Sequence, residues 1–123
     1  MPAILLYTAS ILIFGWGIAH IVPTRAVVKG FGRLSPDNRR IILMEWVAES
    51  WALAFLGLLT GLVGVLRGFN PTSVLVFRLC AGMLILMALW TLFTGARTSI
   101  LPIKFCPAVK TLCAALIFLS TVL

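Results

Sequence analysis

The sequence has very few acidic residues and little polar sequence between its apolar runs. Only three of its 123 residues are Asp or Glu and one is His, and charged residues make up 11% of the chain against 62% hydrophobic residues. A soluble domain normally carries about 25% charged and about 45–50% apolar residues. A globule this small has too much surface for its volume to hide so many apolar side chains from water. The composition therefore predicts one membrane domain over residues 1–123.

Motifs for soluble chemistry are also missing. Cys80, Cys106 and Cys113 form no C-x-x-C pair and lie in or beside apolar runs, so we interpret them as small hydrophobic residues. The ten Lys and Arg residues lie between the apolar runs rather than on one aqueous face, which argues against nucleic-acid binding. No P-loop spacing and no nucleophile–base set is present. Nothing in the sequence requires a cofactor.

Four apolar segments are long enough for helices that cross about 30 Å of hydrocarbon, which takes about 20 residues each. We expect them at about 3–22, 36–66, 71–94 and 106–123, as an all-α four-helix bundle with short loops. Ser35-Pro36-Asp37 and Asn70-Pro71 have the cap-plus-proline pattern of helix starts. The first segment has no small-residue cleavage site, so we expect it to be retained. Lys110 is expected to extend its ammonium to the membrane interface.

Basic residues divide unequally among the three connections, and short loops rich in Lys and Arg stay in the cytoplasm. The first connection has Arg25, Lys29, Arg33, Arg39 and Arg40, the third has Arg97, Lys104 and Lys110, and the second has Arg67 and Arg78. The protein is therefore predicted to lie in a bacterial inner membrane with both termini outside the cytoplasm. The basic loop 24–40 is expected to contact anionic lipid headgroups, and a docking loop for a partner subunit is equally compatible.

Ionisable side chains inside the apolar segments are costly in hydrocarbon and so are candidates for a site. Glu45 and Glu49 are four residues apart and share a helix face, and His20 should lie at a similar depth. Arg97 is the expected partner of Glu45. We interpret this cluster mainly as a buried clasp that fixes helix register, with a binding or acid–base site as the alternative. One histidine and two acids are few ligands for a metal, although His20 beside Gly15 and Gly17 is a candidate ligand for a haem or chlorin.

Small residues predict where helices approach closely. Gly57-x-x-x-Gly61 and Gly64-x-x-x-Gly68 lie on one side of the second long helix. Such grooves admit another backbone at short range in lipid. They serve either packing inside this bundle or association with other membrane subunits or a second copy.

The run Gly15-Trp16-Gly17-Ile18-Ala19-His20 through Gly30-Phe31-Gly32 to Glu45-Trp46-Val47-Ala48-Glu49 resembles small bacterial four-helix membrane proteins of a broadly DoxX-like kind. The resemblance covers about the first half of the chain and implies the architecture. DoxX-like families include a subunit of a quinone-reducing thiosulfate oxidoreductase, but no redox motif here matches that activity.

The function favoured by the sequence is a non-catalytic subunit or scaffold of a larger membrane complex, for example a bioenergetic one. An enzyme is less favoured. The alternatives are a membrane oxidoreductase or lipid-modifying enzyme that uses His20, Glu45 and Glu49 as acid–base groups, or a proton-coupled transporter.

Overall fold

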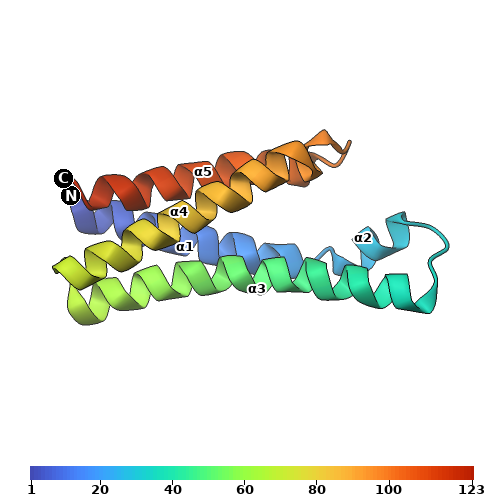
Figure 1. Cartoon of the computed structure of the whole chain (residues 1–123), viewed down its shortest axis with the longest axis horizontal. Helices are drawn as coiled ribbons and strands as arrows, with labels where there is room; N and C mark the ends of the chain where they lie inside the picture. Colours follow the sequence, from blue (N-terminus) through green and yellow to red (C-terminus); the bar gives the residue numbers. More distant parts are fainter.

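The computed structural model describes residues 1–123 and is a helical bundle without strands. Its four long helices are α1 (Pro2–Ile21), α3 (Pro36–Arg67), α4 (Pro71–Phe93) and α5 (Leu101–Ser120), and each is long and apolar enough to cross a membrane. Successive long helices run in opposite directions, so both termini lie at the same end (Figure 1). The all-α four-helix prediction is confirmed.

The predicted capping signals form as hydrogen bonds. Ser35 Oγ accepts from the backbone N–H of Asn38 at 3.2 Å, and Asn70 Oδ1 accepts from that of Ser73 at 3.0 Å. Each bond satisfies a backbone donor that has no partner within the helix. These caps explain why the starts of α3 and α4 lie where the sequence predicted them.

The fourth long helix begins at Leu101, earlier than the predicted position 106. Pro102 occupies its first turn, where a missing N–H costs nothing, and Pro107 lies inside the helix. The sequence contains two prolines that fit a helix start, and the prediction chose the second.

The first connection is more ordered than expected, because it contains a short helix, α2 (Thr24–Gly30). The Thr24 hydroxyl donates to the carbonyl of Ile21 at 2.6 Å, which ties this helix to the end of α1. After α2, the chain turns at Gly32, whose φ of 72° favours glycine. The third connection contains the short 3₁₀ helix η1 (Gly95–Arg97).

The apolar core takes residues from all four long helices, among them Leu6, Leu53, Phe77, Leu84 and Ile117. Within it, α1 and α3 come into backbone contact at glycines. A Cβ at Gly57 would lie 2.6 Å from the backbone nitrogen of Phe14, and one at Gly17 would lie 2.5 Å from that of Ala54.

Three of the four predicted packing glycines therefore serve packing inside this bundle. Gly57, Gly61 and Gly64 face residues of α1. Gly68 instead ends α3 with a φ of 61° and has no neighbour on the Cβ side. The Ser10 and Thr60 hydroxyls hydrogen-bond at 2.9 Å across the same contact and satisfy two buried polar groups.

Helices α3 and α4 meet at the end where they are connected and diverge toward the end that carries α2 and η1 (Figure 1). A cavity lined by residues of both helices lies at that end of the bundle.

We expect Gly57→Ala to destabilise the bundle by about 1–3 kcal/mol, because the new methyl group overlaps the backbone of α1. Gly82→Ala in α4 is the matched control, since nothing lies within 4 Å of its Cβ position. It should be neutral or slightly stabilising through helix propensity. Unfolding of both variants in detergent measures the difference, and equal stabilities would contradict the close α1–α3 contact.

Candidate functional site

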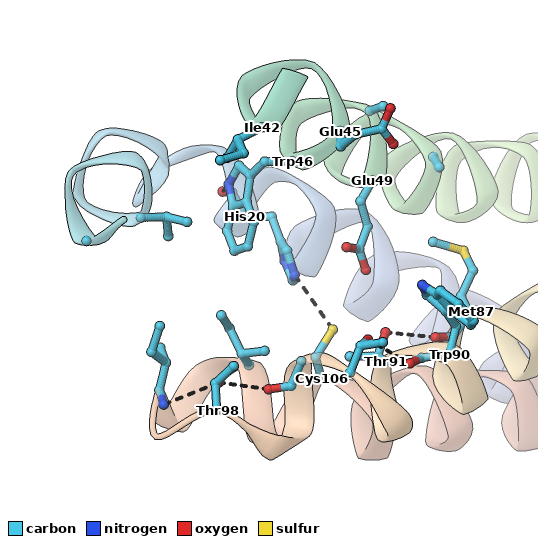
Figure 2. Close-up of a pocket in the computed structure, with 18 of the residues that line it drawn as sticks. His20, Ile42, Glu45, Trp46, Glu49, Met87, Trp90, Thr91, Thr98 and Cys106 are labelled. Carbon is cyan, nitrogen blue, oxygen red and sulfur yellow. Dashed lines mark hydrogen bonds between the residues drawn. The ribbon is translucent and has the colours of Figure 1, made fainter. Parts of the chain in front are cut away.

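A cavity of about 1030 Å³ lies where α3 and α4 diverge (Figure 2). Of its 23 lining residues, 15 are hydrophobic, including Ile42, Trp46, Met87 and Ile103. Polar side chains in the lining include His20, Glu45, Glu49, Thr91 and Cys106. They come from every long helix, so the site exists only when the whole bundle is assembled.

Lys110 of α5 is completely buried and forms the only ion pair in the structure, with Glu49 of α3. Its ammonium also donates to Thr91 Oγ1 of α4 at 2.7 Å, and the Thr91 hydroxyl donates onward to the carbonyl of Met87 at 2.7 Å. A charge inside a membrane bundle is tolerated when it is paired and hydrogen-bonded. The prediction that Lys110 reaches the membrane interface was wrong, because its neutralising partner lies inside the bundle.

Beside this ion pair, His20 of α1 meets Cys106 of α5. Cys106 Sγ lies 3.6 Å from His20 Nε2, and it accepts a hydrogen bond from Trp16 Nε1 at 3.4 Å. His20 Nδ1 lies 2.9 Å from the carbonyl oxygen of Trp16. Because a carbonyl only accepts, this contact places the ring proton on Nδ1 and leaves the lone pair of Nε2 facing the sulfur.

Trp46 fixes the end of α1 that carries His20. Its indole N–H donates to the backbone carbonyl of His20 at 2.8 Å, and the two rings lie 5.6 Å apart at 31°. The bond satisfies a carbonyl in the last turn of α1, which has no partner within the helix. Trp46 thus holds both the backbone and the ring of His20 in place.

The structure brings together only part of the predicted polar cluster. His20 and Glu49 converge, with ligand atoms within 4.8 Å of each other. Glu49 is directed toward Thr91 and Cys106, whereas Glu45 is exposed and directed away (Figure 2). Arg97 is exposed in η1 and forms no ion pair, so the expected Arg97–Glu45 pair is absent.

Of the two glycines beside the expected haem or chlorin, Gly15 has nothing within 4 Å of its Cβ position. Gly17 was expected to leave room for a flat ring, but its Cβ side faces the backbone of Ala54 and the carbonyl of Ser50. The Nε2 face of His20 is occupied by Cys106.

Sequence reasoning missed Cys106 and Lys110 as site residues. A signal was present, because the two are four residues apart and therefore share a face of α5, as Glu45 and Glu49 share a face of α3. Cys106 was classed with Cys80 and Cys113 as an inert thiol. Only the fold separates it from them, by placing it against His20 and Trp16.

The basic loop forms a second, smaller cavity of about 550 Å³. Four of its five predicted basic residues, Arg25, Lys29, Arg33 and Arg39, line this space, and Arg40 does not. They lie at the end of the bundle where α2 and the start of α3 come together.

Comparison of the chain with protein-family models, with curated proteins and with solved structures finds no match.

Glu49→Gln should destabilise the bundle by about 3 kcal/mol, because it leaves the buried Lys110 charge without a counter-charge. Glu45→Gln is the same change one helical turn away on an exposed side chain and should alter stability by about 0.5 kcal/mol or less. Thermal or denaturant unfolding in detergent distinguishes the two.

The double variant Glu49→Gln/Lys110→Met completes this test. Replacing both charges removes the unpaired ammonium, so most of the lost stability should return. A double variant as unstable as Glu49→Gln would contradict the pairing.

Proposed function

We propose that this small membrane protein binds a lipid-soluble molecule that has a polar head. The observation that carries the proposal is the mostly apolar cavity of about 1030 Å³, whose lining contains Glu49, the ion-pair partner of the buried Lys110, and the His20–Cys106 contact. Pockets for small organic ligands have about 300–1,000 Å³, with apolar walls and a few polar groups that set orientation.

The position of the cavity supports entry from the bilayer. It lies between α3 and α4, both of which are apolar enough to span a membrane, and Met83, Leu86 and Trp90 of its lining are strongly exposed on α4. An apolar tail would lie against these side chains. A molecule dissolved in the lipid could enter sideways without passing through water.

The polar groups favour a head that donates hydrogen bonds. Glu49 Oε1 is paired with Lys110, so the other carboxylate oxygen is the acceptor for a hydroxyl or amide of the ligand. A carboxylate and an imidazole at one head group also suit proton transfer, which is the chemistry of the oxidoreductase or lipid-modifying alternative.

The basic loop extends the proposal to the membrane surface. Arg25, Lys29, Arg33 and Arg39 around one cavity suit an anionic lipid headgroup, and each basic residue near such a surface contributes about 1 kcal/mol. With this loop on the cytoplasmic side of a bacterial inner membrane, both termini lie outside. A DoxX-like relationship stays a prediction, and the proposal does not depend on it.

Filling the cavity tests ligand binding. Ala52→Phe should lower the yield of bound molecule several-fold, because Ala52 lines the cavity, whereas Ala115→Phe on the exposed side of α5 should not. The full chain is purified in mild detergent, and its solvent extract is quantified by mass spectrometry per mole of protein.

Equal yields from both variants and the parent chain would contradict the binding proposal. If no molecule co-purifies, while variants of His20 and Glu49 change only the proteins that co-purify, the non-catalytic subunit or scaffold function is supported instead.

Orientation has its own test. Alkaline phosphatase fused after Leu123 should be active in a bacterial host, and a fluorescent protein fused there should be dark, because the C-terminus is proposed to lie outside the cytoplasm. Fusions after Phe69 in the second connection should behave in the same way. A fluorescent C-terminal fusion would contradict this orientation.

A further inference from the structure

We propose that His20, Glu49 and Cys106 form a zinc site with three protein ligands. The proposal rests on the arrangement of these three side chains, and the zinc would share the Glu49 carboxylate and the cavity with the proposed lipid-soluble ligand. Their ligand atoms all lie within 4.8 Å of one another, and they come from α1, α3 and α5.

The spacing fits tetrahedral zinc. Bonds of roughly 2.0 Å to nitrogen and oxygen and 2.3 Å to sulfur place neighbouring ligand atoms roughly 3.3–3.8 Å apart. His20 Nε2 and Cys106 Sγ are already 3.6 Å apart. Only the Glu49 carboxylate needs to move closer to His20 Nε2 and Cys106 Sγ. It lies at the end of a flexible side chain that is about one-third exposed.

The tautomer of His20 is the second argument. A histidine that binds a metal usually donates its other ring N–H to a carbonyl or carboxylate, which orients the ring. Here Nδ1 faces the carbonyl of Trp16 at 2.9 Å, and the lone pair of Nε2 faces the cluster. The indole of Trp46 above the ring and its bond to the His20 carbonyl hold this orientation.

Lys110 orients the second ligand in the same way. It binds Glu49 Oε1, which leaves Oε2 for the metal. Its positive charge opposes the cation, but two anionic ligands outweigh it: the carboxylate, and the thiolate that forms when Cys106 loses its proton to water as the zinc–sulfur bond forms. Imidazole nitrogen, carboxylate oxygen and thiolate sulfur together suit zinc better than magnesium or calcium.

The fourth coordination position would face the large cavity, because all three ligands line it. Three protein ligands with an open position are the arrangement of zinc sites that bind a further molecule, whereas structural sites have four. A zinc ion here would therefore bind a polar or anionic head in the cavity.

Cobalt substitution of the full chain in detergent tests the site. After chelation and removal of the chelator, Co²⁺ should bind at one ion per chain, with a thiolate-to-cobalt charge-transfer band and tetrahedral bands in the visible spectrum. Zn²⁺ should displace it and abolish both. A spectrum without the thiolate band would overturn the proposal.

Variants assign the ligands. Cys106→Ser should lose the thiolate band and bind Zn²⁺ at least tenfold more weakly, and His20→Gln should weaken binding to a similar degree. Cys113→Ser is the matched control, because Cys113 is buried in the core away from the cluster. A thiolate band that survives in Cys106→Ser, or disappears in Cys113→Ser, would overturn the assignment.

Two Glu→Asp variants test the carboxylate ligand without changing the charge of the chain. Glu49→Asp keeps the charge beside Lys110 but shortens the ligand, so it should bind Zn²⁺ more weakly than Glu45→Asp. Gel filtration and circular dichroism confirm that each variant is folded. Equal zinc affinity of the two folded variants would exclude Glu49 as a ligand.

Discussion

The buried charge of Lys110 is the constraint on which the cavity end of the bundle depends. Glu49 and Thr91 must reach it from two other helices, so α3, α4 and α5 are held in one register by a single ammonium group. The geometry cannot relax without exposing that charge to lipid. The same contact fixes Glu49 beside His20 and Cys106, so the bond that stabilises the bundle also arranges the candidate site.

The two ends of the bundle are built differently. From the end where α3 and α4 are connected as far as Gly17 near the cavity, glycines keep α1 and α3 in close contact. Toward the other end α4 leaves α3 (Figure 1), and aromatic and methionine side chains line a cavity rather than a core. The closely packed α1–α3 pair thus forms one side of an open cavity, which suits the binding of an apolar molecule.

Much of the fold could be predicted from the sequence, because apolar length and the cap-plus-proline pattern are local signals. Ser35 and Asn70 marked helix starts correctly for that reason. The partners of Glu49 could not be predicted, since they depend on how α5 is placed against α3, and no local pattern encodes that. The charge of Lys110 suggested the membrane interface, but Lys110 is buried against Glu49. The apolar surroundings of Cys106 in the sequence suggested a core thiol, but Cys106 lies against His20.

Pro107 has a mechanical consequence for the site. It has no backbone N–H, so the carbonyl of Ile103 lacks its usual helical partner, and α5 is weakened in the turn from Ile103 to Pro107. Lys110 lies beyond this turn and is anchored in its ion pair, whereas Cys106 lies within the weakened turn. Bending in this turn would change the distance between Cys106 Sγ and the His20 imidazole while the Lys110–Glu49 ion pair stays intact.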